Sequence, residues 1–267
     1  MSKTIHRIVW AWSAVSLTIG CEAGTRPVQG TLDPEGGPPP QESPAAAQSA
    51  ATDSVDAASS ASLRFDFEED LVGEAPRGFV SARSGQGAPA RWEVIEAEDA
   101  PSGARVVAQL SEDATSYRFP LLVLDEFAAA DVDLSVAGKA VAGSIDQAIG
   151  LVWRYRDEDN YYVVRANALE GNVVLYKMED SRRSDLDIVG VAGTYGVDAE
   201  VPGRSWVRLR VVANGDLFVV ELEGKELFRV RDRTFTQTGK VGLWTKADSV
   251  TWFDDLEVKA LDSGPAR

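Results

Sequence analysis

Short stretches of alternating apolar and polar residues recur from residue 63 to about residue 261. Successive side chains of a β-strand point to opposite faces, so this period of two predicts strands with one buried face. No stretch of this region keeps a helical period over several turns. The pattern predicts an all-β fold in which two antiparallel sheets form a sandwich. The expected strands lie at residues 63–67, 91–94, 104–110, 127–136, 149–155, 161–167, 173–178, 206–212, 217–222, 227–230, 241–245 and 250–258.

The N-terminus has the composition of an export signal. Lys3 and Arg7 precede a short apolar run that ends at Gly20-Cys21, which is too short to span a membrane as a helix. The segment Leu17-Thr18-Ile19-Gly20-Cys21 resembles a bacterial lipobox, with the leucine one place further from the cysteine than usual. The resemblance implies lipidation of Cys21 and an exported chain anchored to a bacterial membrane. The outer membrane or cell surface is favoured because Glu22 is not the aspartate associated with inner-membrane retention. An ordinary signal peptide with a free Cys21 is the alternative.

Four segments of different character follow from this reading. Residues 22–62 are rich in Pro, Ala, Ser and Gly and almost free of large apolar residues, so they cannot bury enough surface to fold. We therefore expect a signal peptide at 1–20, a lipidated cysteine and disordered linker at 21–62, the sandwich at 63–261 and a disordered tail at 262–267.

Charge and residue usage exclude several function classes. The formal charge is −15, and removal of the signal with Lys3 and Arg7 gives −17, which argues against binding to nucleic acid or to anionic lipid headgroups. His6 and Cys21 are the only histidine and cysteine. A mature chain that starts at a lipidated cysteine would lack His- and thiol-based catalysis and the usual zinc or copper ligands.

Two segments resemble the concanavalin A-like jelly rolls of the laminin-G superfamily. Residues 150–167 (GLVWRYRDEDNYYVVRAN) are similar to the central hairpin of that group, and residues 239–256 (GKVGLWTKADSVTWFDDL) to its closing hairpin. The subgroup with the greatest resemblance is the 3-keto-disaccharide hydrolase-like domain. The resemblance implies a jelly-roll sandwich and leaves activity open, because the superfamily mixes lectins, glycosidases and structural modules.

The hairpin around residues 157–160 predicts one polar face. A turn at these residues would pair Arg154 with Val163 and Val152 with Arg165, which places a mainly apolar set on the other face. In jelly rolls of this type the polar concave face holds sugars, so Arg154, Arg165 and Asn167 are candidate ligand contacts. Tyr176 or Lys177 would join them, depending on register, and Lys177 is the one we select. The alternative is a solvated face without a ligand.

A second candidate site is the strand end at residues 244–248. Trp244 could stack on a sugar ring while Lys246 and Asp248 bond its hydroxyl groups. The alternative is that Trp244 belongs to the core and that the two charged residues only decorate a hairpin. No cofactor is expected. The acidic pairs and loops at 157–160 and 254–255 make calcium a low-ranking alternative, because they lack an ordered ligand spacing.

These patterns predict a cell-envelope lipoprotein whose sandwich binds carbohydrate. The first alternative is a secreted glycoside hydrolase or lyase that acts on 3-keto-disaccharides or related glycosides, and the second is a protein-adhesion module. An enzyme should have an acidic cleft with a carboxyl group of raised pKa, and a sugar-binding module a groove with arginines and an aromatic ring. An adhesion module should have an exposed apolar patch instead. The sequence singles out no catalytic residue and no oligomeric state.

Overall fold

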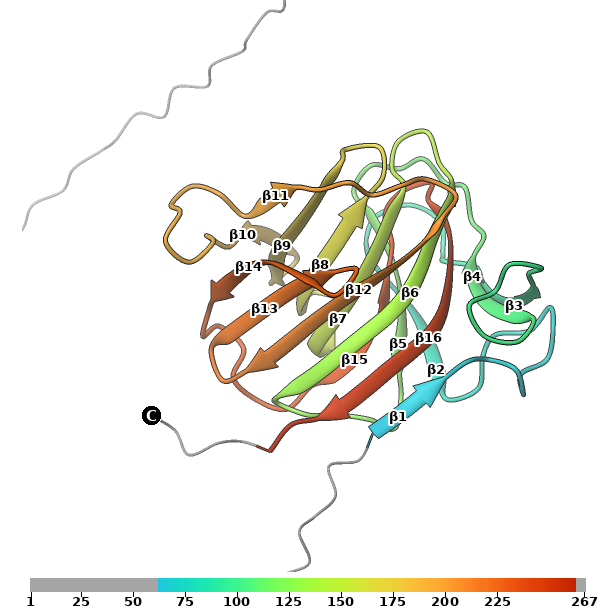
Figure 1. Cartoon of the computed structure of the whole chain (residues 1–267), viewed down its shortest axis with the longest axis horizontal. Coiled ribbons are helices and arrows are strands. Elements are labelled where there is room, and N and C mark those ends of the chain that lie inside the picture. Colours follow the sequence, from blue (N-terminus) through green and yellow to red (C-terminus); the bar gives the residue numbers. More distant parts are fainter. Residues whose placement is uncertain (1–61, 263–267) are drawn as a thin grey trace, which may run out of the picture. The chain divides into compact units, whose positions relative to one another are not determined.

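The computed structural model describes residues 62–262, and these form an all-β sandwich of two antiparallel sheets (Figure 1). The predicted fold class is therefore confirmed. No helix in this range is long and apolar enough to cross a membrane. The export signal, Cys21 and most of the expected linker, together with the last five residues, lie outside the described residues.

The two sheets have eight strands each. Sheet A has the order β14 (Lys225–Arg231), β13 (Leu217–Leu222), β12 (Trp206–Asn214), β6 (Val132–Ala142), β16 (Val250–Ala260), β4 (Arg105–Gln109) and β3 (Trp92–Glu96), with β1 (Ser62–Phe65) also paired to β16. Sheet B has the order β10 (Arg182–Asp185), β9 (Asn172–Glu179), β8 (Asn160–Asn167), β7 (Ala148–Asp157), β15 (Lys240–Trp244), β5 (Arg118–Leu124) and β2 (Phe79–Gly85), with β11 (Gly196–Asp198) also paired to β9.

The main hydrophobic core lies between the sheets. Strand β12 shows how the sequence builds it, because its buried residues alternate with partly exposed ones along the strand. The core joins side chains of both sheets, among them Leu134, Leu151, Trp153 and Phe253. Burial of these side chains provides most of the favourable free energy of folding.

A second apolar layer covers the other face of sheet B, the face turned away from sheet A. All of its buried members come from sheet B: Phe119, Leu121, Val123, Ala148, Val152, Tyr161, Val163, Val174, Tyr176, Met178 and Trp244. Strands of sheet B are therefore apolar on both faces. This explains why β5, with the sequence RFPLLVL, shows no alternation and was not among the expected strands.

Other expected strands also differ from the structure. The strand expected at 127–136 is β6, which begins only at Val132 and continues to Ala142. The edge strand β2 was not expected, because its sequence FVSARSG is half polar and six of its seven residues are only partly buried or exposed at the sheet margin.

The predicted register of the β7–β8 hairpin is wrong. Val152 pairs with Val163 and Gly150 with Arg165, because a bulge between Trp153 and Asp157 shifts the register. Arg154 occupies this bulge with φ of 47°, in the left-handed region, so the residues on its two sides no longer alternate regularly.

Candidate functional site

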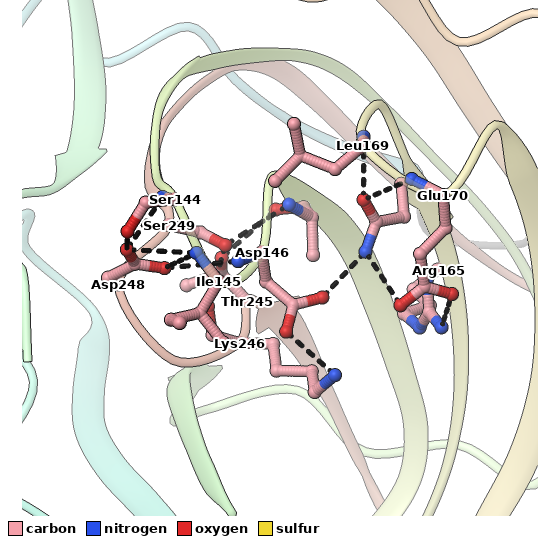
Figure 2. A network of polar contacts seen from close by, with 12 residues as sticks. Ser144, Ile145, Asp146, Arg165, Leu169, Glu170, Thr245, Lys246, Asp248 and Ser249 are labelled. Atoms are coloured by element: carbon pink, nitrogen blue, oxygen red, sulfur yellow. Dashed lines mark hydrogen bonds and ion pairs between the residues drawn. The ribbon is translucent and has the colours of Figure 1, made fainter. Parts of the chain in front are cut away.

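Five charged or amide side chains form a continuous network at one end of sheet B, on the face of the second apolar layer (Figure 2). Lys246 Nζ lies 2.7 Å from Asp146 Oδ2, and Asn167 Nδ2 donates to Asp146 Oδ1 at 2.6 Å. The same amide donates to Glu170 Oε1 at 3.3 Å, and Arg165 donates to Glu170 Oε2 at 2.7 Å. Each carboxylate of the network therefore lies between a cation and the amide group of Asn167.

The loops of this site are held by buried side chains. Asp248, which follows β15, accepts the backbone N–H groups of Ser144, Ile145 and Asp146 at 2.6–3.1 Å. Asn167, at the end of β8, accepts the N–H groups of Leu169 and Glu170 through Oδ1. Each side chain satisfies backbone donors that the turns leave free, so Asp146 and Glu170 are presented from rigid loops.

The charges of the network keep Glu170 ionised. Burial disfavours its charged form, but hydrogen bonds from Arg165 and Asn172 and the nearby charge of Lys246 outweigh burial and lower the pKa of Glu170. A carboxylate in this state accepts hydrogen bonds and is a poor general acid.

A groove of about 180 Å³ lies beside the network, over the paired strands β9 and β11 and the loop that precedes β11. Asn172 connects the two, because it lines the groove and also accepts a hydrogen bond from Arg165 at 3.3 Å and donates one to Glu170 at 3.1 Å. Polar groups and one aromatic ring make up most of the wall. The groove is lined by Asn172, Val174, Gly193, Thr194, Tyr195, Gly196, Val197 and Asp198.

Two buried polar atoms next to the groove have no hydrogen-bond partner among the described residues. They are Nε of Arg165, a side chain that is 2% exposed, and the hydroxyl group of Tyr176, which is 1% exposed. Burial raises the pKa of Tyr176 against the attraction of Arg165 and Arg183, so its hydroxyl group remains a hydrogen-bond donor at neutral pH, and an arginine Nε–H can only donate. A ligand oxygen is the kind of acceptor that these donors lack.

Of the residues that the sequence singles out, Arg165, Asn167, Lys246 and Asp248 converge on this end of sheet B. Asp248 shapes the loop and has no free oxygen for a ligand, since both oxygens accept backbone hydrogen bonds. Lys246 is ion-paired with Asp146 and its side chain is 18% exposed.

The structure places Arg154 away from the network, contrary to the predicted strand register. Its side chain is buried at another position and donates to the carbonyl oxygens of Ala130, Phe235 and Gly215 at 2.6–2.7 Å and to Asp131 at 3.1 Å. The bulge at Arg154 turns the guanidinium toward the core ring of Phe218, at 5.4 Å, and away from the face of Arg165.

Lys177 and Trp244 also differ from the prediction. Strand alternation places Tyr176 on the face of Arg165 and Lys177 on the opposite face, where it bonds Thr234 and lies 3.0 Å from Glu179. Trp244 does share the face of Arg165, but it is fully buried and stacked on Phe119 at 5.5 Å. It therefore offers no exposed ring to a ligand in this conformation.

Asp146, Glu170, Asn172 and Tyr176 belong to the site although the sequence did not select them. Asp146 and Glu170 lie in loops, where acidic residues are common, and their proximity depends on strand pairing across the sheet. The alternation along β9 did offer Tyr176 as one of two choices.

The acidic segments considered for calcium are engaged in other contacts. Asp255 lies 2.5 Å from Arg64, and Asp254 accepts the backbone N–H groups of Ser102 and Asp255. Within residues 62–262 no three Asp, Glu, His or Cys side chains are arranged to hold a metal ion. Burial raises the pKa of Asp254 to about 6, but this residue belongs to sheet A and not to the network.

No family model and no curated protein matches the sequence. The fold does resemble solved structures. The carbohydrate-binding module CBM66 from Bacillus subtilis superposes with a TM-score of 0.52 at 16% identity, over 68% of this chain and 96% of the module. The cellulose-induced protein Cip1 gives a TM-score of 0.50 at 12% identity, over 76% of this chain and all of that one. At these identities the likeness establishes a shared β-sandwich fold.

Proposed function

We propose that the chain binds carbohydrate in the groove over the paired strands β9 and β11, next to the network of sheet B. The observation that carries the proposal is the buried Arg165, which is fixed by Glu170 and Asn172 at the groove and keeps Nε without an acceptor. The fold likeness to a carbohydrate-binding module supports the same class of ligand.

Sugar hydroxyl groups suit this site because each donates and accepts hydrogen bonds. Arg165 and Asn172 offer donors, and Glu170 and Asp198 offer acceptors at or beside the groove. Tyr195 adds a half-buried ring against which the C–H face of a sugar can pack. A groove with an aromatic ring in its wall and a buried arginine behind Asn172 matches the expectation for a binding module better than that for an adhesion surface.

Glycoside hydrolysis is the second candidate. Asp146 Oδ1 and Glu170 Oε1 both accept hydrogen bonds from Asn167 Nδ2, at 2.6 and 3.3 Å. The two carboxylate oxygens are therefore at most about 6 Å apart. This is near the separation that carboxyl pairs of glycosidases have. The lowered pKa of Glu170 and the ion pair of Asp146 with Lys246 favour binding over catalysis, for ordinary glycosides as for 3-keto-disaccharides.

The binding proposal is tested by calorimetry of the full-length chain against a panel of neutral, acidic and 3-keto oligosaccharides, with product analysis of the same samples. Asn172→Ala should weaken binding by at least tenfold, because it removes a groove contact and loosens Arg165 and Glu170. Arg229→Ala is the matched control, since Arg229 pairs only with Glu226 at the surface of sheet A. Absence of binding across the panel, or equal affinities of the two variants, would contradict the proposal.

We further propose that Cys21 carries a lipid and anchors the chain in the cell envelope, with the outer membrane or cell surface favoured. The lipobox-like sequence supports this proposal. Mass spectrometry of the N-terminal peptide should show a diacylglyceryl group on Cys21, and Cys21→Ser should move the protein from the membrane to the soluble fraction. An unmodified thiol at this residue would contradict lipidation.

A further inference from the structure

The second apolar layer is unusual for an outer face of a sandwich. A sheet face turned to solvent is ordinarily polar, yet Trp244, Tyr161 and Val163 are fully buried on this one. Side chains from the two margins of sheet B must therefore cover it. The contacts that close this cover determine whether the layer can be reached by a ligand.

The cover is closed by three hydrogen bonds that join distant strands. In two of them Ser84 of β2 donates to the carbonyl oxygen of Glu158 and accepts from the hydroxyl group of Tyr161 at 3.0 Å. The hydroxyl group of Tyr117, which precedes β5, donates to the carbonyl oxygen of Ser181 at 3.0 Å, in the turn between β9 and β10. Three strands, β8, β7 and β15, separate β9 from β5 in the sheet. The Tyr117–Ser181 contact therefore spans the face, and we name it the strap.

The strap lies over aromatic rings. Tyr117 packs edge-on against Phe119 at 4.8 Å, and Phe119 stacks on Trp244. From the other margin, the guanidinium of Arg183 lies 4.3 Å from the ring centre of Tyr176, which meets Trp244 edge-on at 6.2 Å. A row of aromatic rings in contact, from Phe119 through Trp244 to Tyr176, thus lies beneath the side chains that join the two margins of sheet B.

The strap itself is weak. Tyr117 is 38% exposed, and a single neutral hydrogen bond at an exposed position contributes little to stability. Two donors beneath it, Arg165 Nε and the Tyr176 hydroxyl group, are buried without an acceptor, and this disfavours the closed state. The strap is more exposed than the buried Tyr161–Ser84 hydrogen bond across the same face, so the cover should open first at Tyr117.

We propose that the strap is a gate over an aromatic extension of the carbohydrate site. This inference rests on the proposed function. When the gate opens, a sugar unit packs its C–H face against Trp244 and Tyr176 while its oxygens accept hydrogen bonds from Arg165 Nε and the Tyr176 hydroxyl group. The surface groove then binds one part of an oligosaccharide, and the gated extension binds another.

Acrylamide quenching of tryptophan fluorescence tests the gate without any glycan. Tyr117→Ala in the full-length chain should raise the quenching constant, and Tyr117→Phe, which removes only the hydrogen bond, should raise it less. The increase should vanish in Tyr117→Ala/Trp244→Phe, because Trp244 is the tryptophan beneath the strap. Val80→Ala, at an exposed position of β2, is the matched control. Melting curves establish that each variant is folded.

Binding to the same oligosaccharide panel is the second readout. The closed state dominates in the parent chain, and Tyr117→Ala removes one hydrogen bond and one aromatic contact from it, so this variant should bind roughly three- to tenfold more tightly than the parent chain. Unchanged quenching in Tyr117→Ala, or equal or weaker glycan affinity, overturns the gate. Increased quenching at Trp244 without binding of any glycan by any variant supports the gate and refutes the proposed function instead.

Discussion

Arg154 and Arg165 lie on neighbouring strands and are both 2% exposed, yet their surroundings differ. Arg154 makes four hydrogen bonds, three of them to backbone carbonyl oxygens, so four of its five N–H donors are engaged within the fold. Arg165 is held by two side chains at the groove and keeps Nε free. The first arginine joins segments of the fold, and the second is available for binding.

Replacement of Arg154 should therefore reduce stability strongly. Arg154→Ala leaves Asp131 and three carbonyl oxygens without their donor and should lower the free energy of unfolding by about 3–5 kcal/mol. Chemical denaturation measures this loss. Arg229→Ala, which breaks an exposed ion pair, should change stability by at most about 0.5 kcal/mol. A small effect of Arg154→Ala would show that the arginine is not a structural clamp.

Asp248 should stabilise the loop of the site in a pH-dependent way. Burial disfavours its charge, but the hydrogen bonds from Ser144, Asp146 and Ile145 outweigh burial and lower the pKa of Asp248. Asp248→Asn turns one acceptor into a donor facing backbone N–H groups, so it should reduce the free energy of unfolding by about 1–3 kcal/mol at pH 7. Circular dichroism melts compare the two proteins.

Measuring the stability of the parent chain and of Asp248→Asn at several pH values tests whether the charge of Asp248 causes the difference. A lowered pKa contributes stability above the unfolded value of about 3.9, and this contribution is lost as the pH falls through the folded pKa. The difference between the parent chain and Asp248→Asn should therefore shrink below pH 4. A difference that stays constant down to pH 3 would refute the charge-based explanation.

Bulges are the elements that change which face a residue occupies. In β7 the bulge moves Arg154 to the core side, and in β16 an irregularity between Asp254 and Glu257 places two adjacent carboxylates near β1 and the β3–β4 turn. Asp255 has φ of 48° at this point. A bulge thus creates buried charge that a regular strand would expose.

The bulge of β16 should make stability depend on pH in the opposite direction from Asp248. Burial, reinforced by the charges of Asp255 and Asp66, raises the pKa of Asp254 to about 6. A raised carboxyl pKa stabilises the fold at low pH, and this contribution is lost as the pH rises from about 4 through 6. A carboxyl ¹³C titration of Asp254 should have its midpoint near pH 6. A midpoint near pH 4 would contradict the buried environment.

Alternation in the sequence was enough to predict the sandwich and to place Arg165 and Asn167 on one face, because a regular strand fixes the relative direction of residues two apart. It did not predict β5, which is buried on both faces, or the position of Arg154, which depends on a bulge. It also did not predict the pairing of Asp146 and Glu170 through Asn167, because that contact depends on how loops are held across the sheet.

At the scale of the whole molecule, the outer faces of the two sheets differ. Sheet A carries ion pairs such as Arg210 with Asp133 and Glu221, which are satisfied within the chain. A hollow of about 430 Å³ lies beside these ion pairs on sheet A, whereas sheet B carries the groove next to Arg165 Nε and the Tyr176 hydroxyl group, and the gated aromatic layer. A ligand should therefore protect one face and leave the other unchanged.

Hydrogen–deuterium exchange of the full-length chain with and without a bound oligosaccharide from the panel tests this most directly. We predict slower exchange at residues 165–176 and 193–198 in the complex, with exchange in β6, β12 and β13 of sheet A unchanged. Protection confined to sheet A, or binding without protection of these segments of sheet B, would contradict the proposed site.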